Sequence, residues 1–569
     1  MSKYVNIDDD NFYEFINRKY AQYKIPKKHR SLKEICFPKK YELQIPQKFL
    51  AEFINSKTPY TGILIWHKIG SGKSCSAIHI AEKFKNIKKI MVVVPASLKG
   101  NFRSELRSLC AGQNYLTDKE RQALKKLHPS EYAYKEIIKK SDARIDKYYT
   151  IYSYNKFVGL IKSKNLNLNN TLLIIDEVHN MISETGTYYE NLYDVIHSSP
   201  NNMRLVIMSA TPIFDKPAEI SLTMNLLLRD KQMPTGQEFY RTFINTKFTP
   251  NGPIYSVKNM DLFKEYIRGY ISYYRGAAPK SFPRSEIHIV KCTMSDIQKN
   301  LYQKVIKLEA KDDIDDFIGM DIPNNFFIGV RMISNFTYPN KKIGQKGYDS
   351  LVERDFDIDR LQKYSPKFVR ILRKIRRAPG TVFVYSNFKE YGGIKIFARM
   401  LEHYGYKNYE YNGSGRKRYA VFTGDQDLQY KDEIKAVFNN KNNEDGSKIK
   451  IILGSSAIKE GISLLRVSQV HIIEPYWNIS KLNQIIGRAI RFCSHKDVPY
   501  ERQEVQVYIY LATHPDIKMT VDQYIMRMAI QKQLINNQFE KALKESAIDC
   551  ELFKFANIYP GEEDIKCEK

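Results

Sequence analysis

Two series of short apolar runs, each run separated from the next by a stretch with helical spacing, constrain the fold of this chain most strongly. The first series comprises Gly62–Trp66, Lys89–Val94, Tyr149–Tyr152, Leu172–Ile175 and Arg204–Met208. The second follows Pro379-Gly380 and comprises Thr381–Tyr385, Tyr419–Phe422, Lys448–Leu453, Val470–Ile473 and Val505–Tyr510. Short apolar strands that alternate with helices are typical of parallel sheets covered on both faces. The sequence therefore predicts an α/β protein with two parallel-sheet lobes.

The segments outside these two series are predicted to be mainly helical. From about Phe214 to Pro366 little strand alternation occurs apart from Glu286–Val290, which indicates the end of the first lobe and a helical insertion. Val521–Phe553 has apolar residues at helical spacing and is expected to pack back on the second lobe. We expect an N-terminal arm (1–40), a first lobe (41–285), a linker and helical insertion (286–365), a second lobe (366–512) and a C-terminal helical segment (513–569).

Charge and cysteine usage limit the class of protein. Lys and Arg number 90 against 63 Asp and Glu, and the net charge of +27 favours a polyanionic partner, with a basic but non-binding surface as the alternative. The seven cysteines are scattered without a C-x-x-C pair, so neither disulfides nor a zinc site is expected. We therefore expect the protein in a reducing compartment. No run approaches the roughly 18 apolar residues of a membrane span. A soluble intracellular protein without membrane contact is therefore expected.

A glycine loop follows the first apolar run directly. Backbone N–H groups of such a loop at a helix start point at phosphate oxygens, a lysine reaches the terminal phosphates, and the next hydroxyl binds a metal. The predicted ATP-binding segment comprises His67, Lys68, Ile69, Gly70, Ser71, Gly72, Lys73 and Ser74. His67 stands where the full P-loop pattern has Gly or Ala, and a simple turn between strand and helix is the alternative.

Two carboxylates end the apolar run Leu172–Ile175. Strand ends at the rim of a parallel sheet are where α/β folds bind ligands, so Asp176 is expected to hold Mg²⁺ together with Ser74. Glu177 is expected to orient and deprotonate the attacking water. A solvated loop start is the alternative for an acidic pair, but its occurrence together with Lys73 favours catalysis.

Two arginines near the end of the second series predict a further part of the ATP site. Arg488 and Arg491 are expected to supply charge to the γ-phosphate from the second lobe, and Gln484 to touch the nucleotide or its water. Ser209-Ala210-Thr211 is expected to couple the nucleotide cleft to the nucleic acid, or simply to cap a helix. Gln47 is a candidate reader of adenine, with an ordinary exposed glutamine as the alternative.

These motifs together resemble a known family. The set Gly70–Ser74, Asp176–His179, Ser209–Thr211, Gly454–Ala457 with Glu460–Ser463, and Gln484–Arg491 resembles superfamily 2 helicases of the Swi/Snf-related kind. Further phrases resemble the nucleoside triphosphatase I group of poxviruses and giant DNA viruses, which includes the early transcription factor small subunit. These phrases are Tyr364–Phe368, Val384–Phe388, Glu474–Asn478, Gly487–His495 and Ala547–Cys550.

The resemblance implies two RecA-like lobes, a helical insertion and a helical tail. It also implies an ATP-binding role for Gly461 and a nucleic-acid track that addresses phosphates and is therefore largely independent of sequence. The implied track residues are Pro95, Ser97, Tyr152, Tyr154, Ser386, Asn387, Gly424, Ser455 and Ser456.

The activity that the resemblance implies is an ATP-driven DNA translocase of viral transcription, acting in termination, elongation or early initiation. Its partners would be DNA, single-stranded or duplex, with RNA as the alternative, together with the viral RNA polymerase and transcription factors, in the virion and the host cytoplasm at the viral factory. Two other hypotheses are a processive DNA or RNA helicase and a non-hydrolysing nucleic-acid-binding transcription subunit. Intact Lys73, Glu177, Arg488 and Arg491 argue against the last.

Overall fold

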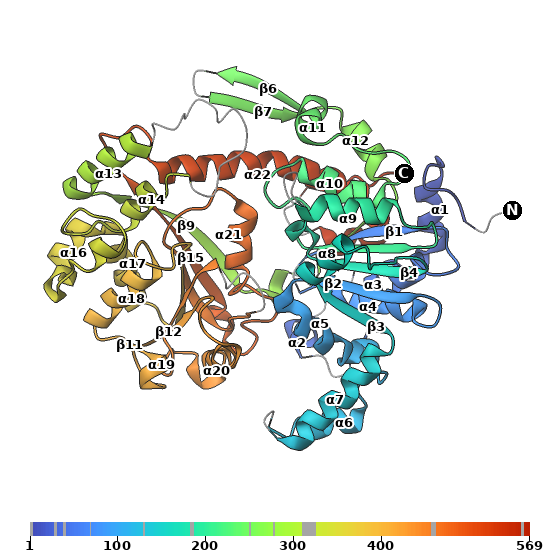
Figure 1. Ribbon diagram of the computed structural model, residues 1–569, viewed down its shortest axis with the longest axis horizontal. Coiled ribbons are helices and arrows are strands. Elements are labelled where there is room, and N and C mark those ends of the chain that lie inside the picture. Colours follow the sequence, from blue (N-terminus) through green and yellow to red (C-terminus); the bar gives the residue numbers. More distant parts are fainter. Residues whose placement is uncertain are drawn as a thin grey trace. The chain divides into compact units, whose positions relative to one another are not determined.

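The chain divides into two compact units, which we call unit 1 and unit 2. The computed structural model describes residues 4–27, 31–37, 41–68, 70–128, 131–182, 187–249, 252–276, 279–309, 326–456, 462–558 and 563–569. Unit 1 comprises Met1–Pro279 and Leu534–Lys569, and unit 2 comprises Lys280–Gln533 (Figure 1). Each unit is built on its own parallel sheet, so the prediction of two parallel-sheet α/β lobes is confirmed.

Unit 1 has a six-stranded sheet in the order β3-β2-β4-β5-β1-β8. Every neighbouring pair in it is parallel. The strands are β1 (Gly62–His67), β2 (Lys89–Val94), β3 (Tyr149–Ser153), β4 (Thr171–Asp176), β5 (Arg204–Ser209) and β8 (Ile271–Tyr274). All residues of β1 and β4 are buried, which explains their continuous apolar character.

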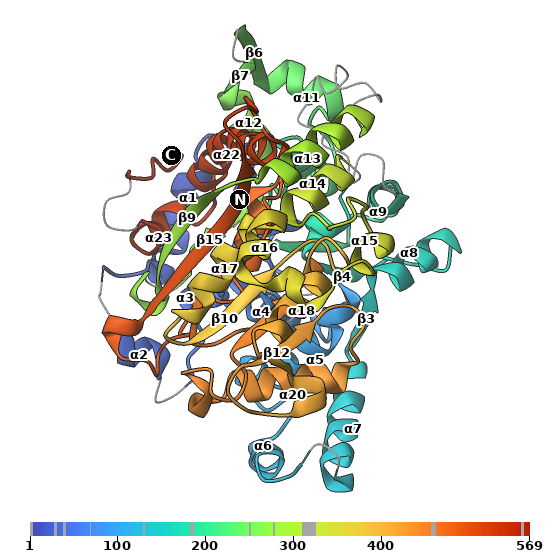
Figure 2. The same cartoon turned by 90° about the vertical axis from the view of Figure 1, so that its left-hand side faces the viewer.

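Helices cover both faces of this sheet. The helices of unit 1 are α1 (Phe12–Lys19), α2 (Leu32–Cys36), α3 (Ile45–Phe53), α4 (Lys73–Phe84), α5 (Lys99–Leu106), α6 (Asp118–Leu124), α7 (Tyr132–Asp146), α8 (Tyr154–Lys162), α9 (Thr187–His197), α10 (Glu219–Leu227), α11 (Gly236–Phe243), α12 (Met260–Ile267) and α23 (Cys550–Asn557). Figure 2 shows α6 and α7 lying side by side away from the sheet. Outside the sheet, the strands β6 (Ile244–Thr249) and β7 (Gly252–Val257) form an antiparallel hairpin.

Unit 2 has a seven-stranded sheet in the order β11-β12-β13-β10-β14-β15-β9. Its strands, all parallel to their neighbours, are β9 (Arg284–Thr293), β10 (Thr381–Tyr385), β11 (Lys407–Asn408), β12 (Arg418–Phe422), β13 (Ile451–Gly454), β14 (Val467–Ile472) and β15 (Glu504–Thr513). Its helices are α13 (Asp296–Glu309), α14 (Ile328–Asn335), α15 (Gln345–Tyr348), α16 (Ile358–Tyr364), α17 (Pro366–Arg376), α18 (Ile394–His403), α19 (Tyr409–Asn412), α20 (Leu428–Phe438) and α21 (Ile479–Ile486). The long helix α22 (Val521–Glu545) begins in this unit.

The segment Tyr364–Phe368, which resembles the viral family in sequence, has a structural role at the start of α17. Pro366 is the first residue of α17, where its missing N–H leaves no hydrogen bond unmade, and Ser365 Oγ accepts a hydrogen bond from Phe368 N at 3.1 Å. Lys367 is buried and pairs with the buried Asp522 of α22 at 2.6 Å. The phrase therefore starts a helix and joins it to α22.

Two expectations about the region between the two series and about the tail need correction. The region Phe214–Pro366 also contains β8, which is an edge strand of the first sheet. The expected strand Glu286–Val290 is part of the longer β9, which pairs along its whole length with β15 of the second sheet. Val521 and Ile525 of α22 pack with Trp477 in unit 2 as expected. The expectation that the helix packs on the second lobe as far as Phe553 is wrong, because residues from Leu534 onward belong to unit 1, where Phe553 is part of the core.

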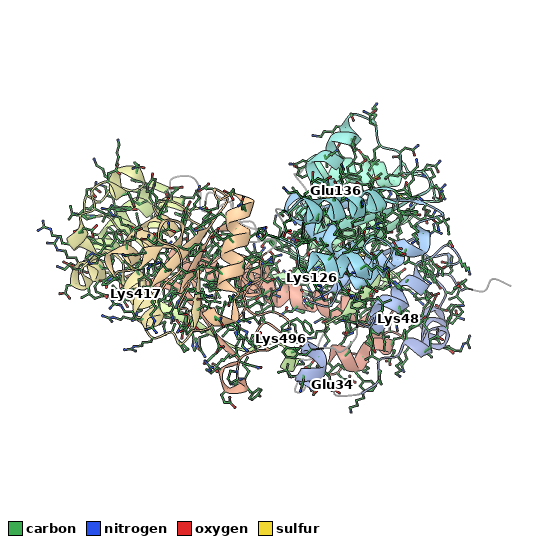
Figure 3. The ribbon with its side chains drawn as sticks, turned by 90° about the horizontal axis from the view of Figure 1, so that it is seen from below. Glu34, Lys48, Lys126, Glu136, Lys417 and Lys496 are labelled. Carbon is green, nitrogen blue, oxygen red and sulfur yellow. A yellow bond between two sulfur atoms is a disulfide. The ribbon has the colours of Figure 1, made fainter. Side chains whose placement is uncertain are left out.

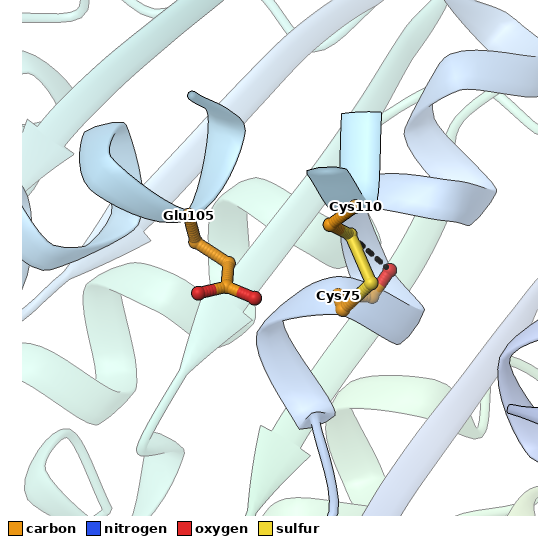
Figure 4. A group of neighbouring side chains, drawn as sticks. All are labelled: Cys75, Glu105 and Cys110. Atoms are coloured by element: carbon orange, nitrogen blue, oxygen red, sulfur yellow. Dashed lines mark hydrogen bonds between the residues drawn. A yellow bond between two sulfur atoms is a disulfide. The ribbon is translucent and has the colours of Figure 1, made fainter. Parts of the chain in front are cut away.

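The expectation that the cysteines form no disulfides is also wrong. Cys75 is bonded to Cys110 and Cys550 to Cys567. Cys75 lies in α4 and Cys110 in η3 (Leu109–Ala111), and the side chain of Glu105 lies beside this pair (Figure 4). Spacing in the sequence could not show this, because packing of η3 against α4 brings the two residues together. None of the helices in the described ranges has the length and apolarity that crossing a membrane requires.

Candidate nucleotide site and nucleic-acid track

The glycine loop joins a buried strand to a helix, as a phosphate cradle requires. β1 ends at His67 and α4 begins at Lys73. Gly70 and Gly72 have φ of 84° and 80°, values that residues with a side chain rarely adopt. A Cβ at Gly72 would also lie 2.5 Å from Gln47 Nε2. The loop therefore places its N–H groups at the N-terminus of α4, where anions are stabilised.

Gln47 supports the glycine loop from α3. Its Nε2 donates to Gly72 O at 3.4 Å, and its Oε1 accepts from Gln44 N at 2.9 Å. The side chain is buried, so the alternative of an ordinary exposed glutamine is excluded. A role in reading adenine stays a prediction, and Ile69 and Gly461, which were also predicted to bind the nucleotide, lie outside the described residues.

Lys73, Glu177, His179 and Ser209 form a connected chain of polar side chains. Lys73 Nζ donates to Glu177 Oε1 at 3.1 Å. His179 Nδ1 lies 3.4 Å from Glu177 Oε2 and 3.3 Å from Ser209 Oγ. Burial raises the pKa of Glu177, but Lys73, His179 and a hydrogen bond from the Ala210 backbone together outweigh burial and hold this pKa below its ordinary value. Glu177 is therefore ionised at neutral pH, the state that a base or water-orienting group requires.

Asp176 and Ser74 offer the oxygen donors that suit a magnesium ion. Asp176 ends β4, and its Oδ1 accepts from Glu177 N at 3.0 Å. Ser74 is the second residue of α4, next to Lys73. A carboxylate and a hydroxyl are hard oxygen ligands, which Mg²⁺ prefers. The residues present thus fit the ion that the sequence predicts at these positions.

Two side chains with a supporting role here were not predicted. Tyr154, expected only in the nucleic-acid track, donates its hydroxyl to the carbonyl of Asp176 and, at 3.0 Å, to that of Glu177. Glu219, at the start of α10, accepts from Phe214 N at 2.8 Å and Asp215 N at 2.9 Å and so fixes the chain after Thr211. The sequence phrase Tyr152-Ser153-Tyr154 contained the first of these residues, but no sequence signal marked Glu219.

Arg488 and Arg491 converge on one backbone carbonyl in unit 2. Nη1 of each lies 3.5 Å from Ile462 O, and Arg491 Nη1 also donates to Ser463 Oγ. Gln484 lies on α21, which ends at Ile486, two residues before Arg488. The two guanidinium groups are thus gathered at one place, although their contact with a γ-phosphate stays a prediction.

The predicted track residues lie at strand ends in both units. Pro95 and Ser97 follow β2, and Tyr152 lies near the end of β3. Gly424 follows β12, and Ser455 and Ser456 follow β13. Carboxyl ends of parallel strands share one edge of a sheet, so each set lies along the edge where ligands bind in such folds.

Ser386 and Asn387, also predicted for the track, are held from within unit 2. Ser386 is buried and its hydroxyl donates to both oxygens of Glu474, at 3.0 and 2.9 Å. Asn387 N donates to Glu474 at 2.5 Å, and Asn387 Oδ1 accepts from Lys481 at 2.8 Å. Glu474 belongs to the phrase Glu474–Asn478, whose role is thus to anchor the end of β10. Contact of these residues with nucleic acid stays a prediction.

Comparison with known proteins gives related helicases. The family model "Type III restriction enzyme, res subunit" matches residues 36–214, and "Helicase conserved C-terminal domain" matches residues 366–493. The mimivirus protein named Putative ATP-dependent RNA helicase R563, from Acanthamoeba polyphaga mimivirus, is 67% identical over 567 residues, which cover 100% of this chain and 99% of that protein.

A more distant relative and a solved structure are also similar to this chain. A Termination factor NPH-I homolog of African swine fever virus is 27% identical over 564 residues, covering 86% of this chain and 76% of that protein. The helicase domain of Hef from Pyrococcus furiosus is 14% identical, with coverage of 84% of this chain and 97% of that chain and a TM-score of 0.42.

The two sheets, the phosphate loop and the acidic pair define an ATP-hydrolysing enzyme that acts with nucleic acid. The chain belongs to the superfamily 2 helicases of giant viruses.

Proposed function

We propose that this chain is an ATP-driven DNA translocase that serves viral transcription. The observation that carries the proposal is the chain of side chains from Lys73 through Glu177 and His179 to Ser209. It links Lys73, which would sense the terminal phosphates, to Ser209 at the end of β5, so a change at the phosphates could be passed on to a second strand end. The name of the African swine fever virus relative, a termination factor, supports a transcriptional role.

In the proposed reaction each residue has one task. Lys73 binds the β- and γ-phosphates, and Glu177 orients the water that attacks the γ-phosphate and accepts its proton. Asp176 and Ser74 would hold Mg²⁺, which supplies positive charge to the phosphate oxygens. Arg488 and Arg491 add charge to the γ-phosphate when the two lobes close, and Gln484 contacts the nucleotide or water.

Movement along DNA would follow from closing and opening of the two lobes during each ATP cycle. The strand-end residues predicted for the track bear hydroxyl groups and backbone amides, which address phosphates and not base edges. We therefore propose translocation that does not depend on sequence. The viral RNA polymerase and transcription factors are the proposed protein partners, in the virion and the viral factory of the host cytoplasm.

The region Phe214–Pro366 and the chain from Leu511 onward are the proposed docking surfaces for the polymerase. They contain none of the motifs Gly70–Ser74, Asp176–His179 and Gln484–Arg491. Reversal of exposed charges there, at Lys341 or Glu353 for example, should abolish co-purification with the polymerase while DNA-stimulated ATPase activity remains. Unchanged association across a set of such variants would leave these segments as a scaffold.

A second candidate function is that of an RNA helicase, which the name of the mimivirus relative favours. The two proposals are separated by ATPase assays with single-stranded DNA, duplex DNA and RNA in parallel, together with strand displacement from partial duplexes. We expect DNA to stimulate hydrolysis more than RNA, without strand displacement. Stimulation by RNA alone, with displacement, would replace the first proposal by the second.

Two variants serve as controls for the chemistry. Lys73→Ala should abolish turnover and weaken nucleotide binding, because the cation at the phosphates is lost. Glu177→Gln should bind ATP as the wild type does and stop the chemical step. Hydrolysis by Glu177→Gln at nearly the wild-type rate would refute the role given to Glu177.

A further inference from the structure

A buried carboxylate near the C-terminus is bonded to the edge strand of the first sheet. Ile548 N donates to Ile271 O of β8 at 2.8 Å. The next residue, Asp549, is fully buried, and its carboxylate accepts from Tyr273 N at 3.0 Å and from the hydroxyl of Ser272. We call Ile548 and Asp549 the C-terminal latch, because they attach the chain after α22 to β8.

The carboxylate of Asp549 is not used for the ordinary task of an aspartate in this position. Asp549 is the N-cap residue of α23, yet its side chain makes no capping hydrogen bond. Burial raises the pKa of this carboxyl to about 7, against the opposing effect of the hydrogen bonds from Ser272 and Tyr273. Burying a carboxylate is costly. The side chain is therefore turned towards β8 and makes its hydrogen bonds there.

From Ser272 the hydrogen bonds continue to the start of the phosphate loop. Ser272 Oγ lies 2.9 Å from His67 Nε2, and β8 pairs with β1 so that Tyr274 is opposite His67. The Ser272 hydroxyl donates a hydrogen bond to Asp549, which leaves its oxygen free to accept one from His67 Nε2. Burial and Lys73 lower the pKa of His67 to about 3, so the ring is neutral. His67 is the last residue of β1, three positions before Gly70.

A second contact from β8 reaches the same loop independently. Gly276, just after β8, has φ of 96°, and a Cβ there would lie 3.3 Å from Ser71 Cβ and 3.5 Å from Ser71 Cα. Lys68 N donates to Tyr274 O at 3.1 Å. Lys68 and Ser71 of the loop are thus supported by β8 and the chain after it. A displacement of β8 would therefore reach the backbone that is proposed to bind phosphate.

We propose that Asp549 is a positioning residue of the nucleotide site, which acts through Ser272 and His67 to hold the phosphate loop in its binding geometry. The inference rests on the proposed ATP-binding role of Gly70–Ser74. It gives the phrase Ala547–Cys550 a function: the C-terminal segment completes a nucleotide site whose own residues lie far upstream.

The test is a double-mutant cycle with Ser272→Ala and Asp549→Asn in the full-length protein. Each variant should raise the KM for ATP and the Kd for ADP roughly tenfold, with a smaller change in kcat, because a displaced loop binds phosphate less well. The double variant should be no worse than the more affected single variant, since both changes break one chain of contacts. Asp564→Asn is the matched control, because its exposed carboxylate lies in the same C-terminal segment and pairs with Lys554 at 3.1 Å.

The outcomes separate this inference from the proposed function. Wild-type values of KM and Kd in both single variants, additive effects in the double variant, or equal losses of kcat and binding that follow a lost folded fraction would each overturn the positioning role. If Asp549→Asn fails to fold, Ser272→Ala decides alone through its KM and Kd. Absence of ATP hydrolysis in the wild-type protein would instead refute the proposed function.

Discussion

At the scale of single residues, Glu177 has an unusual backbone conformation. Its φ of 50° and ψ of 49° lie in the left-handed region, which is uncommon for a residue with a side chain. Such conformations persist where surrounding contacts hold them, and they cluster at functional sites. Here the carbonyls of Asp176 and Glu177 accept from Tyr154, and Glu177 N donates to Asp176. The turn directs the carboxylate to Lys73, the position that the proposed role of Glu177 in hydrolysis requires.

His471 gives a prediction about pH. It is fully buried in β14, with Nδ1 2.8 Å from the Tyr510 hydroxyl and Nε2 3.0 Å from Gln469 Oε1. Burial, and secondarily Lys374, lower the pKa of His471 to about 3, whereas the unfolded chain takes up this proton near pH 6.5. The stability of unit 2 should therefore be lost as pH falls from about 6.5 towards 3, by up to about 1.4 kcal/mol per pH unit for this group.

His471→Gln removes this titration. The difference in thermal midpoint between wild type and variant, measured from pH 7.5 down to 4.5, should shift steadily in favour of the variant as pH falls. Other titrating groups of unit 2, such as His495 and Glu474, are common to both proteins and cancel in the difference. A difference that stays constant over this range would contradict the assignment.

At the scale of elements, the sequence predicted the sheets better than their edges. All ten apolar runs became strands of two parallel sheets, because continuous apolar character is what burial on both faces requires. β8 was missed because Ile271-Ser272-Tyr273-Tyr274 is only four residues long and polar in part. The hairpin of β6 and β7 was missed because it belongs to neither sheet and has no apolar run.

The crosslink between α4 and η3 gives a prediction at this scale. Cys75 and Cys110 are 35 residues apart, and a disulfide that closes a loop of this length typically stabilises by about 2–4 kcal/mol. Cys110→Ser should therefore lower the thermal midpoint of unit 1 measured under non-reducing conditions. Peptide mapping after alkylation should recover a Cys75–Cys110 linked peptide from the wild type. Absence of this peptide, with equal midpoints for both proteins, would refute the crosslink.

At the scale of the whole molecule, the proposed arginine finger and the phosphate loop belong to different units. Arg491 lies in unit 2 and Lys73 in unit 1. Arg491→Ala should bind ATP and DNA separately, yet lose DNA-stimulated hydrolysis by on the order of 10³-fold, as removal of such a finger does. Arg416→Ala, at an exposed arginine outside the motifs, is the control. Equal losses in the two variants would refute catalysis by closure of the lobes.

Net charge gives a second prediction for the whole molecule. The surplus of +27 includes exposed lysines in both units, among them Lys126, Lys417 and Lys496 (Figure 3). The logarithm of the DNA affinity should fall linearly with that of the salt concentration, by about 0.7 per phosphate neutralised on a single strand. Fluorescence anisotropy with two unrelated oligonucleotides should give the same slope and similar affinities. A flat salt dependence, or a strong preference for one sequence, would indicate recognition of bases.

Residues of the candidate site could be predicted where they form a short sequence motif. They could not be predicted where they come from segments that are far apart in the chain. Lys73, Asp176 and Glu177 were predicted because a phosphate loop and a strand-end acidic pair each have a short signature. The hydroxyl of Tyr154 and the carboxylates of Glu219 and Asp549 support that site through contacts which only the fold creates. A pattern read along the chain cannot show which distant side chains meet.

The return of the C-terminal segment to unit 1 has a consequence for how the protein is made. Ile548, Leu552 and Phe553 belong to the same core as Phe12 and Phe49, so this core lacks part of its apolar surface until these residues have left the ribosome. Unit 2, by contrast, is contiguous in sequence from Lys280 to Gln533. Domains generally fold as units during synthesis, in the order in which they become complete. The core of the lobe that is translated first can therefore be completed only after residues 548–553 have been made.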